Sequence, residues 1–260
     1  MSIPVNTSNC LQHYFDKVFV ITVPRFTDRH LRVRERLEGL PFEFFWGADK
    51  QQLNLETAMA DGTYDEGKTK KLQRSGKALN TGELACSLSH RLLYEEMVKN
   101  GWQKVLILED DVWPLYENLD QLPQSLKELP SHWELVYLGY LKHEQVTVKL
   151  KLKQFFYKLA SGIGLMKWSY TMICNLLPKY FSAHLKKAGF HDCTHAYAIT
   201  LDAAKKLVKA QTPVCYRADD LLSHSILKGE LAAFVTEPKY FDQEDFHLKE
   251  MTSKIKETDQ

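Results

Sequence analysis

The most informative segment of the chain is LNTGELACSLSHRLLYEEMVKNGWQKVLILEDD, residues 79–111. Asn80 and Glu83 have the spacing of a capping box, and leucines at helical intervals follow them. The apolar run at 104–108, KVLIL, is typical of a buried parallel strand. The segment therefore predicts a helix and then a strand of an α/β fold.

Three acids, Glu109, Asp110 and Asp111, follow that strand directly. Open α/β sheets bind ligands outside the carboxyl ends of their strands. Because neighbouring acids repel one another, such a cluster commonly holds a divalent cation. Mn²⁺ or Mg²⁺ takes further ligands from water and phosphates, which favours a substrate that carries a diphosphate. Alternatively, the acids cap the next helix or simply end the strand.

Strand and helix patterns alternate along the rest of the chain. We expect strands at 17–23, 42–46, 135–140 and 196–200, and helices from Thr27 or Asp28 to Glu38 and over 201–210. The polar stretch 61–77 shows no clear period and is predicted to be a mobile loop. This alternation predicts a mostly parallel sheet with helices on both faces.

Composition limits the class of protein. A chain of 260 residues that is 44% hydrophobic can bury a large core. No apolar run reaches the roughly 18 residues of a membrane span, and the first twenty residues lack the pattern of a signal peptide. The odd number of cysteines, without a CxxC pair, argues against a disulfide framework and a zinc site and favours a reducing compartment. The five are Cys10, Cys86, Cys174, Cys193 and Cys215.

The formal net charge of +1 hides a strongly basic segment. Residues 141–187 hold nine lysines and one acid, Glu144, and many aromatic and aliphatic side chains lie among them. We favour a surface that rests on an anionic bilayer. A helical subdomain packed on the main domain is the second interpretation. Nucleic acid ranks lower, because the segment contains no arginine.

Two further groups of residues are candidates for a site. Asp219 and Asp220 begin a predicted helix, where one of them either caps the helix or acts as a general base. His195 and Tyr197 stand at a strand start and either line a pocket or are buried, and burial is the favoured interpretation for His195. His90 on the predicted helix has the same ambiguity.

Five segments resemble glycosyltransferase family 25, the lipopolysaccharide and lipooligosaccharide sugar transferases, which are also similar to collagen galactosyltransferases. They are VFVITVPRFTDRH (18–30), residues 79–112, WELVYLGY (133–140), CTHAYAIT (193–200) and RADDLL (217–222). The resemblance implies a GT-A-like fold. The basic segment, expected to be a mainly helical insertion, lies outside the matching segments. The resemblance also implies that a DXD-type motif and Mn²⁺ or Mg²⁺ bind a UDP-sugar and that a hexose is transferred, commonly galactose.

Carried onto this sequence, the resemblance makes Asp111 the best metal ligand, with Asp110 beside it, and places Glu109 and Asp110 near the ribose or the metal waters. The remaining donor contacts that it implies are Thr22, Arg25, Arg29, Ser89, His90 and His195. Four residues depart from the family pattern. Thr22-Val23 replaces an Asn-Leu pair, Cys193 stands where Gly is frequent, and Ala218 stands where Pro or Val is common.

Together these features predict one GT-A-like domain over 1–260, with the insertion at 141–190. The expected function is inverting transfer of a hexose to a lipopolysaccharide-type or lipooligosaccharide-type acceptor, with Asp219 or Asp220 as the base. The expected location is the cytoplasm, peripherally at the inner face of the membrane, with no nucleic-acid partner. The alternatives are a metal-dependent phosphohydrolase or phosphotransferase, and a non-catalytic nucleotide-sugar binder at the membrane.

Overall fold

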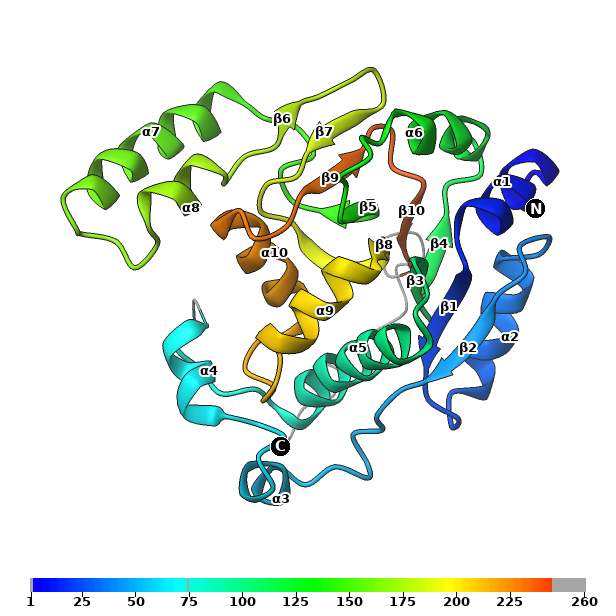
Figure 1. Cartoon of the computed structure of the whole chain (residues 1–260), viewed down its shortest axis with the longest axis horizontal. Helices are drawn as coiled ribbons and strands as arrows, with labels where there is room; N and C mark the ends of the chain where they lie inside the picture. The colour runs from blue at the N-terminus through cyan, green and yellow to red at the C-terminus, as the bar shows by residue number, and fades with distance from the viewer. Residues whose placement is uncertain (1, 74, 245–260) are drawn as a thin grey trace.

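A large mixed sheet forms the centre of the protein in the computed structural model, which describes residues 2–73 and 75–244 (Figure 1). Its strands follow the order β2-β1-β3-β8-β5-β9-β7-β6. Within the described residues, six of these eight strands run in one direction, and β8 and β7 run in the opposite direction. The predicted α/β fold with a mostly parallel sheet is confirmed. The strands are β1 Lys17–Thr22, β2 Glu43–Trp46, β3 Lys104–Glu109, β5 Leu135–Leu141, β6 Lys179–Tyr180, β7 Leu185–Lys187, β8 Asp192–Thr200 and β9 Ala233–Thr236.

Helices cover both faces of the sheet, as predicted. Helices α5 (Thr81–Asn100), α9 (Leu201–Ala210) and α10 (Ala218–Lys228) pack on the face that is nearer the viewer in Figure 1. Helices α1 (Val5–Tyr14), α2 (Thr27–Arg36) and α6 (Leu122–Glu128) contribute to the core on the opposite face. A short antiparallel pair, β4 (Val112–Pro114) with β10 (Phe241–Gln243), and a 3₁₀ turn at Leu119–Gln121 complete this side.

The central strand β3 shows why this segment folds as it does. Val105 and Ile107 enter the core on the α5 side, and Leu106 and Leu108 enter the core on the α2 side. Successive side chains of a strand point to opposite faces, so a strand covered on both faces must be apolar throughout. All four side chains are fully buried. The first polar side chain after them, Glu109, therefore marks the place where the strand leaves the core.

The predicted capping box at the start of α5 is confirmed. The Glu83 backbone N–H donates to Asn80 Oδ1 at 2.8 Å, and the Asn80 backbone N–H donates to Glu83 Oε2 at 3.0 Å. The helix ends at Gly101, whose φ of 70° is the left-handed conformation that glycine adopts without strain. Local signals therefore fix both ends of α5, and the first buried residue of β3 follows four positions later.

The predicted mobile loop at 61–77 is wrong for part of its length. Helix α4 occupies Glu66–Leu72 within it and follows the short helix α3 (Leu55–Ala60). Asp65 caps α4, because its Oδ1 accepts a hydrogen bond from the Lys68 backbone N–H at 2.7 Å. Only Thr69 of this helix is buried. The sequence therefore shows no apolar period here, and tertiary contacts decide the conformation.

The insertion begins as two helices, α7 (Val148–Gly162) and α8 (Tyr170–Cys174), which we call the α7–α8 lobe. It projects at the upper left of Figure 1. Leu150 and Tyr157 on one side of α7 pack against a small core that includes Met172. No residue of α7 is fully buried. After the lobe, the insertion returns to the sheet as β6 and β7, so it is helical only in its first part.

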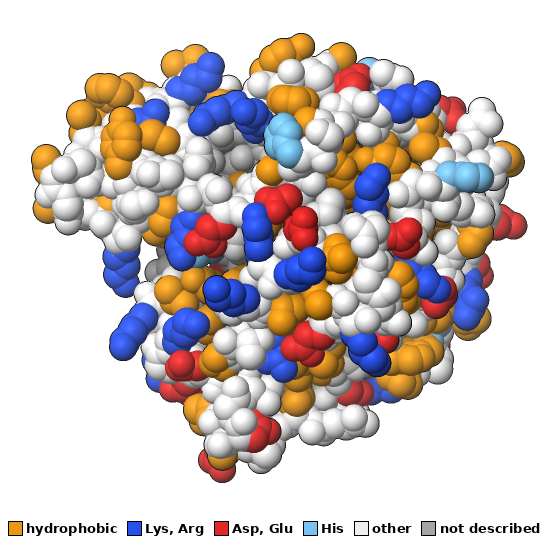
Figure 2. All heavy atoms as spheres, in the orientation of Figure 1, with side chains coloured by type: hydrophobic (Ala, Val, Ile, Leu, Met, Phe, Trp, Pro, Cys, Tyr) orange, Lys and Arg blue, Asp and Glu red, His pale blue; other side chains and the backbone are white. Residues whose placement is uncertain are grey.

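The outer side of α7 exposes apolar side chains to solvent. Figure 2 shows hydrophobic and basic side chains together on the surface of the lobe. The most exposed are Val148, Leu152, Phe155, Phe156, Leu159 and Ile163, each at least 54% exposed. Within the described residues, no helix combines the length and the apolar character that crossing a membrane requires.

Candidate active site

One pocket at the carboxyl ends of β1 and β3 brings together most of the residues that the sequence singled out. Strands β1 and β3 are parallel neighbours with Ile21 opposite Glu109, so the residues that follow each strand meet at one edge of the sheet. Helix α5 contributes the opposite wall. The predicted site residues that line this pocket are Thr22, Arg25, Arg29, Ser89, His90, Glu109, Asp110 and Asp111.

Asp110 is fixed by two residues from the first βα unit. The Thr22 hydroxyl donates a hydrogen bond of 2.6 Å to Asp110 Oδ2, and the Arg29 guanidinium forms an ion pair with Asp110 Oδ1. Asp110 is only 7% exposed, so the arginine compensates a charge that burial would otherwise disfavour. Both carboxylate oxygens of Asp110 therefore have partners within the protein, and the Arg29 guanidinium lines the pocket that is predicted to bind the nucleotide sugar.

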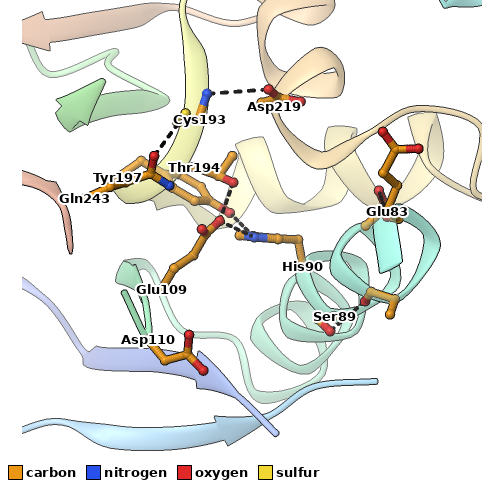
Figure 3. Close-up of polar contacts among 12 residues, drawn as sticks. Glu83, Ser89, His90, Glu109, Asp110, Cys193, Thr194, Tyr197, Asp219 and Gln243 are labelled. Atoms are coloured by element: carbon orange, nitrogen blue, oxygen red, sulfur yellow. Dashed lines mark hydrogen bonds and ion pairs between the residues drawn. The ribbon is translucent and has the colours of Figure 1, made fainter. Parts of the chain in front are cut away.

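Glu109 points away from Asp110, toward α5 and β8 (Figure 3). The Thr194 hydroxyl donates to Glu109 Oε1, and His90 Nε2 lies 3.2 Å from the same oxygen. The other nitrogen of His90 lies 2.7 Å from the hydroxyl of Tyr197. Burial raises the pKa of Glu109, but the contacts with His90 and Thr194 outweigh it and hold the pKa below its ordinary value. Glu109 is therefore a fixed carboxylate.

The rim of the pocket is held by contacts with the chain that follows β2. Arg25 Nε donates to Asp49 Oδ2 at 2.7 Å. Ser89 Oγ accepts a hydrogen bond from the Ala48 backbone N–H at 2.9 Å and donates to the Ala85 carbonyl at 2.7 Å. Ser89 thus ties α5 to the β2 end. Its role as a donor contact, like that of Arg25, stays a prediction.

His195 is not brought to the pocket. Its side chain is fully buried, as the favoured interpretation of the sequence predicted, and burial lowers its pKa to about 4, so it is neutral at physiological pH. A Cβ atom placed on Gly139 would lie only 2.3 Å from His195 Nε2, so only glycine fits opposite the ring. This contact explains the glycine of the LVYLGY strand. The structure gives His195 a packing position rather than a place in the donor pocket.

Asp219 and Asp220 occupy the first turn of α10 but have different surroundings. Asp220 Oδ2 pairs with Arg217 at 2.8 Å. Asp219 faces the start of β8, where its Oδ2 accepts from the Cys193 backbone N–H at 3.5 Å (Figure 3). Burial, followed by the charge of Asp220, raises the pKa of Asp219 to about 6. Of the two acids, Asp219 therefore has the properties of a general base that works near neutral pH.

Strand β8 connects Asp219 to the pocket at the ends of β1 and β3. Cys193, next to Asp219, is followed directly by Thr194, which holds Glu109. Cys193 has φ of 73°, in the left-handed region that favours glycine. The glycine that the family frequently has at this position is thereby explained by backbone conformation. Cysteine is accommodated here at a conformational cost.

The structure also reveals a group of ligand atoms that the sequence analysis missed. Cys86, His90 and Glu109 each place one such atom within 4.8 Å of the others. The Cys-x₃-His spacing on α5 places both side chains on one face of the helix, and this spacing could have indicated the group from the sequence. Burial raises the pKa of the Cys86 thiol well above its ordinary value, so the thiol stays protonated. A hard cation such as Mn²⁺ or Mg²⁺ suits carboxylate oxygens better, and Asp111 offers them in the same pocket.

Comparison with known proteins shows which sequences this chain resembles. The sequence profile of glycosyltransferase family 25 (LPS biosynthesis protein) matches residues 15–222. The chain is 33% identical over 210 residues to inactive glycosyltransferase 25 family member 3 of Homo sapiens, covering 76% of this chain and 29% of the relative. It is 26% identical over 248 residues to procollagen galactosyltransferase 1 of Danio rerio, covering 86% of this chain and 35% of the relative. The chain thus spans about a third of the length of these relatives.

Proposed function

The chain belongs to glycosyltransferase family 25, and from this premise we propose that it transfers galactose from UDP-galactose to a saccharide of a lipopolysaccharide-type or lipooligosaccharide-type glycolipid, with inversion. The observation that carries the proposal is the convergence of Thr22, Arg29, Asp110 and Asp111 on one pocket at the strand ends. A cationic guanidinium beside carboxylates suits a diphosphate that arrives with a divalent cation.

In this proposal each acid after β3 has its own task. Asp110 orients Arg29 through their ion pair, and Thr22 holds the other oxygen of Asp110. Asp111 would hold Mn²⁺ or Mg²⁺, which when bound supplies Lewis-acid stabilisation of the diphosphate. Glu109, fixed by Thr194 and His90, keeps the start of β8 against the pocket.

Asp219 is the proposed base. It accepts the proton of an acceptor hydroxyl, and that oxygen bonds to the anomeric carbon of the donor as the bond between this carbon and the diphosphate oxygen breaks. Attack from the opposite face inverts the anomeric carbon and releases UDP. The pKa of about 6 leaves Asp219 mostly ionised at neutral pH and still able to take a proton.

Product analysis tests this function against its alternatives. The purified protein is incubated with UDP-galactose and Mn²⁺, and the nucleotide products are separated. A transferase cleaves the sugar–phosphate bond and, because no saccharide acceptor is present, passes the galactosyl group slowly to water, which yields UDP and free galactose. A phosphohydrolase or phosphotransferase cleaves within the diphosphate and yields UMP instead. A non-catalytic binder would retain UDP-galactose unchanged, an outcome of interest because one of the relatives carries the word inactive in its name.

We also propose that α7 rests on an anionic membrane surface. Its exposed apolar side is flanked by Lys149, Lys151 and Lys158, a composition that suits insertion beside acidic head groups. Each lysine near such a surface contributes about 1 kcal/mol, so changing all three to Gln should weaken vesicle binding about a hundredfold. A matched control changes Lys205, Lys206 and Lys209 on α9. Equal binding of both triple variants would refute the contact.

A further inference from the structure

A separate cavity of about 480 Å³ lies between the α7–α8 lobe, helix α4 and the segment before β8. Its wall combines residues that are far apart in the sequence, from Lys71 on α4 to His224 on α10. Figure 2 shows basic side chains around the notch between the lobe and the helices below it. The donor pocket shares no lining residue with this cavity within the described part of the chain.

The charged residues that line the cavity are basic. Lys71, Lys142, Lys153 and Lys167 stand around it, and no Asp or Glu of the described residues lines it. Lys142 forms an ion pair with Asp192. The other three lysines form no ion pair with any residue that the structure describes. A concave surface lined by charges of one sign concentrates the field and attracts ligands of the opposite sign.

The inner wall of the cavity is aromatic and apolar. Tyr157 and Trp168 line it, and Trp168 lies against Phe190 with ring centroids 6.0 Å apart. Lys153 Nζ lies 5.4 Å from the centre of the Tyr157 ring, so a cation stands beside an aromatic face. Aromatic side chains offer broad apolar faces on which the C–H side of a sugar ring can pack.

A smaller pocket adjoins this cavity. Trp168, Phe190 and His224 line both, and Asp220 lines the smaller one. His224 Nε2 is buried and has no hydrogen-bond partner among the described residues, so it can still bond to a ligand. Asp219, the neighbour of Asp220, faces the start of β8. The shared lining therefore places the cavity next to the first turn of α10, which carries Asp219.

We propose that this cavity binds the acceptor and that the acceptor is an anionic saccharide bearing a phosphate or a carboxylate near the reacting sugar. The identification as acceptor rests on the proposed transferase function, whereas binding of an anionic sugar does not. The lysines attract the acidic group, and the aromatic wall receives the sugar ring.

Isothermal titration calorimetry at constant ionic strength tests the proposal with four probes: glucose 6-phosphate, glucuronate, glucose and inorganic phosphate. We expect at least one anionic sugar to bind about tenfold or more tightly than glucose and inorganic phosphate. Binding of glucose 6-phosphate alone assigns a phosphate, and binding of glucuronate alone assigns a carboxylate. Binding of neither, or equal binding of glucose or of inorganic phosphate, would overturn the proposal.

Two double variants locate the site. Lys153→Gln with Lys167→Gln removes two charges from the cavity and should weaken the anionic sugar about tenfold. Lys149→Gln with Lys151→Gln removes the same charge from α7 outside the cavity and should leave that affinity unchanged. Equal effects of the two variants would overturn the assignment to this cavity.

UDP binding and UDP release from UDP-galactose are measured on the same samples. If the parent protein neither binds UDP nor releases it from UDP-galactose, but still binds the anionic sugar, the transferase function is refuted and the sugar site is retained. Normal UDP release without binding of either anionic sugar would refute the sugar site alone.

Discussion

Replacing Asp219 by Asn should make the protein more stable and less active at the same time. The substitution keeps the shape of the side chain and an oxygen that can accept from the Asp220 backbone N–H, which donates to Asp219 Oδ1 at 2.8 Å. It removes a negative charge that burial and the neighbouring Asp220 both disfavour. The helix start therefore keeps this hydrogen bond but loses an unfavourable charge.

The size of the stability effect follows from the pKa. A rise from the ordinary value of 3.8 to about 6 corresponds to about 3 kcal/mol between the protonated and ionised forms. The pKa of Asp219 in the folded state lies above that in the unfolded state. The parent protein is therefore as stable as protonated Asp219 allows below about pH 4, and it loses that stability as the pH rises through about 6 and Asp219 ionises. At pH 7.5 the Asn variant should therefore be about 1 to 3 kcal/mol more stable than the parent. This advantage should vanish near pH 4.

Activity should change in the opposite direction. If Asp219 is the base, kcat/KM of the parent should rise with a midpoint near pH 6, and the Asn variant should lose about a hundredfold or more in kcat while still binding UDP. Urea unfolding at two pH values and UDP release across the pH range measure the two effects. Asp220→Asn, which breaks the pair with Arg217, is the control. Equal, small losses of activity in both variants, without a stability gain in Asp219→Asn, would refute the reasoning and leave both acids with a structural role only.

Two further predictions concern the backbone beside the site. Gly139→Ala should lower the free energy of unfolding by about 1 to 3 kcal/mol or more, because the new methyl group would clash with His195 and the Phe241 carbonyl. Urea denaturation measures this change, and unchanged stability would contradict the close contact. Cys193→Gly should raise the thermal midpoint of unfolding, because the left-handed conformation at this position costs a non-glycine residue about 1 kcal/mol. A lower midpoint would show that the side chain of Cys193 stabilises the protein by more than its backbone conformation costs.

The pocket at the ends of β1 and β3 could be predicted from the sequence because local signals and topology agree there. The apolar run of β3 fixes where Glu109 leaves the core, and parallel pairing with β1 places Thr22 beside Asp110. The position of the three acids at the carboxyl end of β3, rather than their presence alone, was the basis for predicting a site there. The capping box of α5 and the apolar run of β3 both pointed to the same arrangement.

Other features depend on tertiary contacts that an apolar pattern does not encode. The apolar pattern of β8 predicts a strand, but it does not encode the direction of that strand, which runs antiparallel between β3 and β5. That direction puts its first residues, Cys193 and Thr194, at the acids. Helix α4 has too few buried residues to show a period, and the basic cavity unites positions from 71 to 224. Such juxtapositions exist only in the folded chain.

The central claim is that the pocket at the ends of β1 and β3 binds a nucleoside diphosphate through a cation held by Asp111. Isothermal titration calorimetry of UDP with and without Mn²⁺, in the parent and in Asp111→Ala, tests it most directly. We predict that Mn²⁺ raises the affinity of the parent for UDP about tenfold or more, and that this gain disappears in the variant while its thermal midpoint is retained. An undiminished gain in Asp111→Ala, or equal UDP binding by the parent with and without Mn²⁺, would contradict the account.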